Sequence, residues 1–267
     1  MRIGLIAGNG RMPLIFADEV KRRGDQLVVV ALKEEADSAI EPKADSLSWI
    51  SLGQLSKTID FFKQNGVERC VMAGQVKHTQ LFRGITPDFR TIKLLATLVN
   101  KKAESVLGAV IQEFAQEGIQ FLPSTLYLEK LLCPIGPLTR IKLNKDQEED
   151  VAFGVPLAKT LSGLDIGQTL VVKDKTVVAV EGMEGTDACI RRAGEVAGKG
   201  CVVIKVARPK QDLRFDVPVI GLRTLESLEA ANVSVLAVEA NKTLLLDKEL
   251  FLEKANALRI AITGISL

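Results

Sequence analysis

The sequence predicts an α/β protein of two domains, an N-terminal Rossmann-like domain with a parallel sheet and a C-terminal domain with a mixed sheet. Three observations predict this fold. Short apolar runs alternate with amphipathic stretches through the first half, the composition turns polar and rich in proline and glycine at 133–150, and a strand–turn–strand pattern follows. A chain of 267 residues is long enough for two domains, each with its own core.

The first domain should consist of strands joined by crossover helices. Strands are expected at 2–7, 26–32, 46–52 and 69–74, and helices at 12–23, at 54–65 and over most of 89–117. In the last stretch the apolar residues form two stripes, Phe89, Ile92, Ala96 and Val99, then Val106, Ala109, Val110 and Phe114. We expect these helices to cover the sheet. The basic pair Lys101 and Lys102 leaves contact with a membrane surface as the alternative.

The change in composition marks 134–144 as a linker between a first domain at 1–133 and a second at 145–267. The second domain should contain a helix to about 162, strands at 169–174, 176–182, 201–207, 217–221, 233–240 and 243–246, helices from 187 and near 224–231, and a final helix and strand. The first two strands read as a hairpin that turns at Asp174 and Lys175. Two α/β domains joined by a linker normally hold their ligand in the cleft between them.

Composition excludes several classes of protein. Lys and Arg number 35 against 33 Asp and Glu, and there is one Trp and one Tyr, so neither a basic field nor aromatic stacking favours nucleic acid as a partner. No apolar run approaches the roughly 20 residues that span a bilayer, and the N-terminus lacks the features of a signal peptide. We therefore expect a cytoplasmic protein without a transmembrane segment.

Cysteine and histidine usage limits the chemistry further. Cys70, Cys133, Cys189 and Cys201 are widely spaced and fit buried, reduced thiols. His78 is the only histidine, which excludes a catalytic triad with histidine and zinc sites with several imidazoles. A bound metal would need oxygen ligands, which favours Mg²⁺, with Mn²⁺ as an alternative.

Two glycine turns in the first domain could meet a phosphate. Gly8, Asn9 and Gly10 lie between the first strand and the first helix, where backbone N–H groups can bind an anion, although Pro13 replaces the third glycine of a dinucleotide fingerprint. A tight turn without a ligand explains the same glycines equally well. The stretch MAGQVKH places Lys77 and His78 after a strand, and an ordinary basic surface loop is the alternative.

Two polar motifs stand in the second half. In EGMEGTDACIRRAG (181–194), Gly185 permits a close turn, and Thr186 or Asp187 can cap the next helix. Helix capping uses only one of these two side chains and gives no role to the carboxylate of Glu184. The second motif, KVARPKQDLRFDVPVIG (205–221), contains many polar and charged side chains within a short segment, among them Lys205, Gln211, Asp212, Arg214 and Asp216. An extended segment would place Asp212, Arg214 and Asp216 on one face, and a ladder of surface ion pairs is the alternative.

Together, GLIAGNGxxP, MAGQV, EGTDACIRRAG and RPKQDLRFDVPVIG resemble the UDP-2,3-diacylglucosamine pyrophosphatase family of LpxI type over nearly the whole chain. The resemblance implies Mg²⁺-dependent hydrolysis of UDP-2,3-diacylglucosamine to UMP and 2,3-diacylglucosamine 1-phosphate (lipid X) in lipid A synthesis of Gram-negative bacteria. It also implies two domains with the substrate between them and a functional aspartate in QDLRFD, carried here by Asp212 or Asp216. Cys189, Val219, Lys77 and His78 depart from the family pattern.

On this hypothesis, Asp212 or Asp216, with help from Asp187 or Glu184, holds Mg²⁺. Lys205, Arg214 and the Gly8–Gly10 turn stabilise phosphate charge, and Lys77, Gly185, Thr186 and Gln211 complete the substrate contacts. Acyl chains would need an apolar groove, for which the helices at 89–117 are the candidates. Peripheral contact with the inner membrane and a homo-oligomer are left open. A nucleotide or nucleotide-sugar binding module without activity, and a nicotinamide-dependent oxidoreductase, are the alternative functions.

Overall fold

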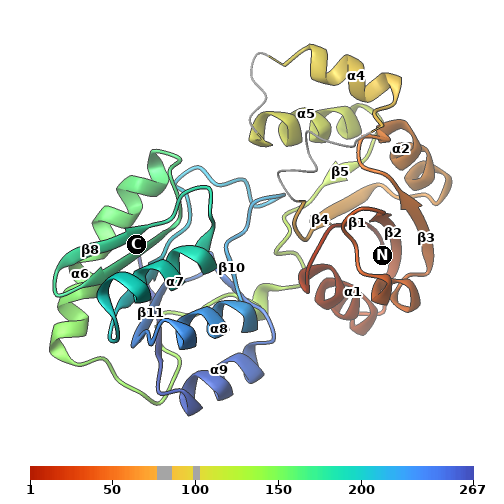
Figure 1. Cartoon of the computed structure of the whole chain (residues 1–267). Coiled ribbons are helices and arrows are strands. Elements are labelled where there is room, and N and C mark those ends of the chain that lie inside the picture. Colours follow the sequence, from red (N-terminus) through yellow and green to blue (C-terminus); the bar gives the residue numbers. More distant parts are fainter. Residues whose placement is uncertain (77–85, 99–102) are drawn as a thin grey trace. The chain divides into compact units, whose positions relative to one another are not determined.

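The computed structural model describes residues 1–76, 86–98 and 103–267. The chain forms two compact units, and each is an α/β unit as the sequence predicts (Figure 1). Unit 1 comprises Met1–Leu128 together with Asp212–Asp216, and unit 2 comprises Glu129–Gln211 and Val217–Leu267. The sequence assigns 212–216 to the second domain, whereas the structure packs this segment in unit 1. Residues 134–144, the expected linker, lie in unit 2 and include the strand β6 (Gly136–Pro137).

Unit 1 contains a five-stranded sheet in which every neighbouring pair is parallel. The strand order is β3 (Ser46–Ile50), β2 (Gln26–Leu32), β1 (Arg2–Ala7), β4 (Arg69–Ala73) and β5 (Gln120–Phe121). The chain builds outward from β1 in one direction and then crosses to β4 on the other side. The carboxyl ends of β1 and β4 therefore form the topological switch point at which open α/β sheets bind ligands.

Four described α-helices accompany this sheet: α1 (Met12–Arg22), α2 (Leu55–Gln64), α4 (Phe89–Ala96) and α5 (Ala103–Gln116), with a short 3₁₀ helix at Ser38–Lys43. Phe62 of α2 and Phe114 of α5 are fully buried, with ring centroids 6.3 Å apart. Phe114 also meets Phe121 of β5 edge to face, with centroids 5.0 Å apart. This aromatic cluster joins the helices to the sheet and confirms Phe114 as a core residue.

The first predicted apolar stripe, on α4, was expected to face the sheet, but its first residues are exposed to solvent. Phe89 is 82% exposed and Ile92 is 52% exposed, whereas Leu94 is buried. Val99 lies outside the described residues. Polar contacts at the start of the helix set its rotation, because the Asp88 carboxylate accepts hydrogen bonds from the backbone N–H groups of Ser56 (2.7 Å) and Thr91 (2.8 Å).

Unit 2 contains a six-stranded mixed sheet and a two-stranded parallel sheet. The large sheet has the order β6, β13 (Ala261–Ile265), β11 (Val235–Glu239), β9 (Val202–Lys205), β7 (Thr169–Lys173) and β8 (Thr176–Val180), and the small one pairs β10 (Val219–Ile220) with β12 (Leu244–Leu245). Strands β13, β11 and β9 are parallel, and β7 and β8 form an antiparallel hairpin. The hairpin turns at Asp174 (φ 51°) and Lys175 (φ 53°), which confirms the predicted turn, since type I′ geometry needs positive φ at both positions.

Helices cover both faces of the large sheet. On one face α6 (Lys145–Gly163) packs Ala158 against Leu170 and Ile204. On the other lie α7 (Thr186–Ala197), α8 (Leu222–Ala230) and α9 (Lys248–Ala257), whose Ile190 and Phe251 are fully buried. Side chains alternate between these faces along β7 and β9, so the continuous apolar runs of these strands reflect burial on both sides.

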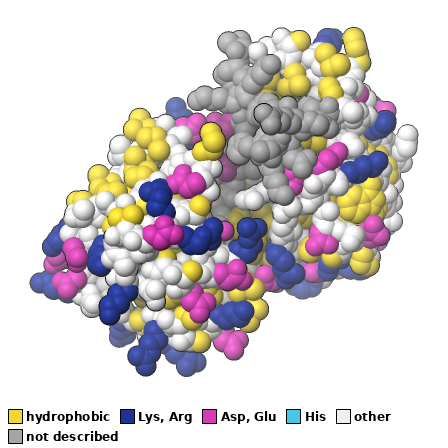
Figure 2. Space-filling model, viewed as in Figure 1, with side chains coloured by type: hydrophobic (Ala, Val, Ile, Leu, Met, Phe, Trp, Pro, Cys, Tyr) yellow, Lys and Arg dark blue, Asp and Glu magenta, His cyan; other side chains and the backbone are white. Residues whose placement is uncertain are grey.

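Other expectations concern cysteines, membranes and surface charge. All four cysteines are buried and free of disulfides, as predicted. No helix in the described ranges is long and apolar enough to cross a membrane. Basic and acidic side chains intermingle on the face drawn in Figure 2, in keeping with the small net charge.

Candidate functional site

The turns that follow β1 and β4 are joined by backbone hydrogen bonds at the switch point of unit 1. The N–H groups of Gly8 and Asn9 donate to the carbonyl oxygens of Ala73 (2.9 Å) and Gln75 (2.8 Å), and Gln75 N–H donates to Asn9 O (2.9 Å). A Cβ on Gly8 would lie 2.7 Å from Gln75 O, so glycine is required for this close approach. Two of the N–H groups expected to bind a phosphate thus donate to carbonyl oxygens within the protein. Gly10, at φ 99°, faces open space.

Segment 212–216 docks at the carboxyl ends of β4 and β5. Ser124, which is buried just beyond β5, donates its N–H to Leu213 O at 2.7 Å. Its hydroxyl lies 2.6 Å from Met72 O and 2.8 Å from Arg214 O. Phe215 packs against the aromatic core of unit 1. Ser124 thus fixes the QDLRFD segment at the carboxyl edge of the parallel sheet, and no local sequence pattern marks Ser124 for this role.

The segment is a turn, which corrects the extended conformation considered from the sequence. The N–H groups of Phe215 and Asp216 both donate to Asp212 O, at 3.2 Å and 2.9 Å. Asp212 also binds its own neighbour, because Arg214 donates Nε to Oδ1 (2.9 Å) and Nη2 to Oδ2 (2.6 Å). The Arg214 hydrogen bonds lower the pKa of the Asp212 carboxyl, and that carboxylate raises the pKa of Arg214. Asp212 is therefore an ionised carboxylate with both oxygens engaged.

Thr186 is the centre of a polar cluster in unit 2. Lys205, at the end of β9 and only 6% exposed, donates Nζ to Thr186 Oγ1 at 2.7 Å. The Thr186 hydroxyl donates to Glu181 Oε1 (3.0 Å), and Thr169 Oγ1 lies 3.2 Å from Thr186 Oγ1. The structure thus brings together two residues predicted to bind substrate, Thr186 and Lys205. Thr169, the first residue of β7, is a member that the sequence motifs missed.

This cluster lies at the N-terminus of α7. The helix begins after Gly185, which has φ 81° and offers no side-chain cap. The free N–H groups and the dipole of a helix N-terminus favour an anion. A buried ammonium group at the same position adds a full positive charge. Gly185, Thr186 and Lys205 together form a site suited to a phosphate oxygen.

Two side-chain amides of unit 2 have buried atoms with unused hydrogen-bonding capacity. Among the described residues, Gln168 Oε1 and Gln211 Nε2 have no hydrogen-bond partner. Gln168 O accepts from Val206 N–H at 2.9 Å, just beyond the end of β9, and Gln211 Oε1 accepts from Arg208 N–H at 3.0 Å. Buried polar atoms are normally paired, so these two are candidates for contact with a ligand or with water.

The predicted metal ligands differ in their availability. Glu184 accepts from Arg192 Nη2 (2.6 Å) and from Gly182 N–H (3.0 Å), and the Arg192 bond lowers the pKa of this carboxyl. Glu184 thus stabilises the turn before α7. Asp187 is half-buried in the first turn of that helix. Within residues 1–76, 86–98 and 103–267, no three Asp, Glu, Cys or His side chains are grouped so as to hold a metal ion. Lys77 and His78 lie outside the described residues.

Comparison with known proteins identifies the family. Residues 2–131 match the family model of the LpxI N-terminal domain, and residues 134–263 match that of the LpxI C-terminal domain. The chain belongs to the LpxI family. A relative from Caulobacter vibrioides, UDP-2,3-diacylglucosamine pyrophosphatase LpxI, is 28% identical over 277 residues, which cover 99% of this chain and 97% of the relative. The two LpxI domains meet at residues 131–134, close to the division between the units at Leu128 and Glu129.

Solved structures show only a distant likeness to this LpxI family member. Phosphoribosylglycinamide synthetase from Anaerococcus prevotii has a TM-score of 0.28 and 9% identity, over 66% of this chain and 38% of that one. N5-carboxyaminoimidazole ribonucleotide synthetase from Thermotoga maritima has a TM-score of 0.25 and 20% identity, over 68% and 41%. The chain thus spans about two fifths of the length of these structures, and TM-scores this low carry no argument about function.

Proposed function

We propose that this LpxI family member hydrolyses UDP-2,3-diacylglucosamine to UMP and 2,3-diacylglucosamine 1-phosphate, a reaction of lipid A synthesis. The observation that carries the proposal is the match of both LpxI domains, which together extend over residues 2–131 and 134–263. The Caulobacter relative is a UDP-2,3-diacylglucosamine pyrophosphatase, which supports this choice of substrate. The proposed activity requires a protein that binds a diphosphate and activates water.

The Thr186 cluster supplies groups for the diphosphate. Lys205 is nearly buried, and an ammonium group held in a protein interior interacts with a phosphate oxygen more strongly than one in bulk water. Thr186 accepts the Lys205 hydrogen bond and thereby fixes the ammonium group at the N-terminus of α7. In this role Lys205 neutralises phosphate charge, and the amide of Gln211 is a further donor.

We propose Asp216 as the metal ligand, because the resemblance to the LpxI family implies a functional aspartate in the QDLRFD segment. Asp212 already gives both carboxylate oxygens to Arg214, so its proposed role is to orient that guanidinium group. Mg²⁺ is commonly held by one or two carboxylates together with substrate phosphates, so a site without three clustered acids fits this ion. Bound Mg²⁺, or Mn²⁺ in its place, would polarise a phosphoryl oxygen and lower the pKa of water.

Arg214 retains donors for the substrate. A guanidinium group has five N–H donors in one plane, and Asp212 occupies the edge formed by Nε and Nη2. The guanidinium group is held in a fixed orientation, which favours binding of a phosphate without loss of side-chain entropy. Asp212 and Arg214 thus act as a positioned pair, and this assignment gives the two aspartates different roles.

The acylated substrate also determines where the reaction would occur. UDP-2,3-diacylglucosamine carries two acyl chains, so we place the protein in the cytoplasm at the surface of the inner membrane. Phe89 and Ile92 on the exposed face of α4 offer apolar side chains for such a surface. Flotation with lipid vesicles should be weakened by a Phe89→Ser/Ile92→Ser variant.

The function can be tested with purified protein and UDP-2,3-diacylglucosamine. UMP release should require Mg²⁺ or Mn²⁺, stop with EDTA and resume when excess metal is added. Asp60→Asn, a change at an exposed carboxylate on α2, is the matched control for variants of Asp216. Saturable binding of the substrate without UMP release in the presence of metal would favour the binding module instead.

A further inference from the structure

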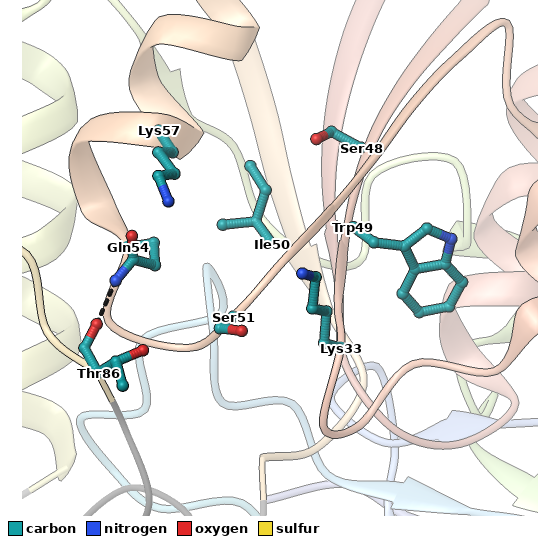
Figure 3. A pocket seen from close by; sticks show the side chains of 8 residues that line it. All are labelled: Lys33, Ser48, Trp49, Ile50, Ser51, Gln54, Lys57 and Thr86. Atoms are coloured by element: carbon teal, nitrogen blue, oxygen red, sulfur yellow. Dashed lines mark hydrogen bonds between the residues drawn. The ribbon is translucent and has the colours of Figure 1, made fainter.

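A polar cavity of about 260 Å³ opens in unit 1 beside β2 and β3 (Figure 3). It lies at the carboxyl ends of these strands, where Lys33 follows β2 and Ser51 follows β3. Its other wall is the beginning of α2, with Gln54 at the N-cap and Lys57 in the first turn. The cavity therefore lies along the edge of a parallel sheet that commonly binds ligands, two strands away from the Gly8–Gly10 turn.

Two lysines give this cavity a positive charge. Figure 3 shows the amino groups of Lys33 and Lys57 turned toward the space between them. No salt bridge or hydrogen bond of either ammonium group is found with any residue in the described part of the chain. The adjacent Glu34 forms no ion pair with Lys33 or Lys57 in the described part of the chain, and its Oε2 accepts the backbone N–H of Leu52 at 3.1 Å. Other lysines of unit 1 do pair, such as Lys43 with Asp18 and Lys63 with Glu117.

The start of α2 adds donors to the same wall. Gln54 at the N-cap makes no hydrogen bond from its side chain to the helix, and its Nε2 donates to Thr86 O instead. The first turn of α2 thus presents a helix N-terminus to the cavity, where backbone dipoles favour an anion. The hydroxyl groups of Ser48 and Ser51 line the remainder. Two unpaired ammonium groups, hydroxyls and a helix N-terminus are the usual donors for a phosphate group.

The volume of the cavity and the orientation of its tryptophan indicate which part of a ligand can bind there. Its volume is below the about 300–1,000 Å³ of pockets that enclose drug-sized ligands. Trp49, the aromatic residue of the lining, turns its ring aside in Figure 3 and donates Nε1 to Glu41 Oε1 at 3.0 Å. The indole is therefore held away from stacking on a base.

We propose that the cavity formed by Lys33, Ser48, Ser51 and Lys57 is a binding site for a phosphate group, which it recognises by charge without reading a nucleobase. The site is separate from the groups assigned to hydrolysis above. A free phosphate ion and the phosphate of a nucleotide share this chemistry. Both should bind with similar affinity at this site.

The only tryptophan of the chain allows a local test, because Trp49 lines the cavity. Its fluorescence should change on titration with inorganic phosphate or with UMP, with dissociation constants within threefold of each other, and uridine should cause no change. The Lys33→Met/Lys57→Met variant should weaken both titrations at least tenfold. Lys93→Met removes an exposed lysine of unit 1 outside the cavity and should alter them less than twofold.

Several results would overturn the proposal. A fluorescence change with uridine would show that the site reads the base. Equal losses in the Lys93→Met and Lys33→Met/Lys57→Met variants would show a general effect of net charge. Absence of saturable phosphate binding, both in the Trp49 signal and by calorimetry, would show that the chain has no such site. Because the titration measures no turnover, each result stands whether or not the protein releases UMP.

Discussion

Glu239→Gln should destabilise unit 2, because Glu239 is a buried acceptor surrounded by donors. The side chain is 1% exposed at the end of β11. It accepts from Lys159 Nζ (3.0 Å), Lys242 Nζ (2.8 Å) and the backbone N–H of Ala207 (2.8 Å). Glutamine has the same shape but only one acceptor oxygen, so at least one of these donors would face an NH₂ group.

The magnitude follows from the partners. Loss of a buried ion-pair partner typically costs about 3–5 kcal/mol. The two lysines can move partly toward water, since their side chains are 26% and 44% exposed, which reduces the cost. Ala207 N–H is fully covered, and leaving such a donor unpaired costs about 1–3 kcal/mol. We expect Glu239→Gln to lower the free energy of unfolding by about 2–4 kcal/mol at neutral pH.

The same contacts predict a pH dependence. Burial by itself would raise the pKa of Glu239, but the hydrogen bonds from Lys242, Lys159 and Ala207 outweigh it, and the pKa is lowered from its ordinary value of 4.5. A carboxyl group with a lowered pKa stabilises the folded state fully above the unfolded value and loses this contribution as the pH falls through the folded value. The difference between wild type and Glu239→Gln should therefore be full above pH 4.5 and should shrink below it.

Urea unfolding of both proteins between pH 3 and 8, followed by circular dichroism, would measure this difference. Lys159→Met and Lys242→Met are useful companions, because each removes one donor and leaves Glu239 paired with the other. Equal stability of wild type and Glu239→Gln at pH 7, or a difference that grows as the pH falls below 4, would refute the reasoning.

Three further predictions concern the turn in unit 1, the Thr186 cluster and the ion pairs of Glu117 with Lys63 and Arg90. Gly74→Ala should lower unfolding stability by about 1–3 kcal/mol, because Gly74 has φ 92° and an added Cβ would lie 2.6 Å from Asn9 O; an unchanged melting temperature would contradict this. Thr186→Val should reduce kcat/KM for UMP release about tenfold or more, whereas Thr186→Ser keeps the hydroxyl that binds Lys205 and should retain activity. Glu117 should titrate with a pKa of about 2, because it accepts hydrogen bonds from Lys63 and Arg90; NMR of Arg90→Met should show that pKa moving toward 4.5, and no movement would count against the pairing.

Local chemistry made much of the fold predictable. Alternation of apolar runs identified most of the strands but missed the two-residue strands β5 and β6, which carry no such run. The pair Asp174 and Lys175 marked a hairpin because the flanking β-branched runs could pair across it. The rotation of α4 was not predictable from its apolar stripe. It depends on the Asp88 carboxylate, which caps α4 and also binds the first turn of α2. A contact between helices decides which apolar residues face outward.

The motifs supplied candidate residues for the site, but they did not reveal how those residues are arranged. The motifs identified Thr186 and Lys205, whose side chains are joined by a hydrogen bond in the structure. They could not show that Asp212–Asp216 packs in unit 1, because the Ser124 contact joins residues 90 positions apart. The turn itself had a local signal, since the Asp212 side chain accepts the N–H of Arg214 two residues later, a common arrangement of aspartate in turns. The alternation of charged residues at 212–216 suggested an extended segment, but the hydrogen bonds of the Asp212 side chain with Arg214 favour a turn.

The central claim is a metal-dependent hydrolysis in which Asp216 and Asp212 have different roles. Its most direct test is the release of UMP from UDP-2,3-diacylglucosamine by wild type, Asp216→Asn and Asp212→Asn across a Mg²⁺ titration. We predict equimolar UMP and 2,3-diacylglucosamine 1-phosphate from wild type, a loss of at least about a hundredfold in kcat for Asp216→Asn, and an unchanged Mg²⁺ requirement for the residual activity of Asp212→Asn. Full activity of Asp216→Asn, or UMP release that continues without metal, would contradict the account.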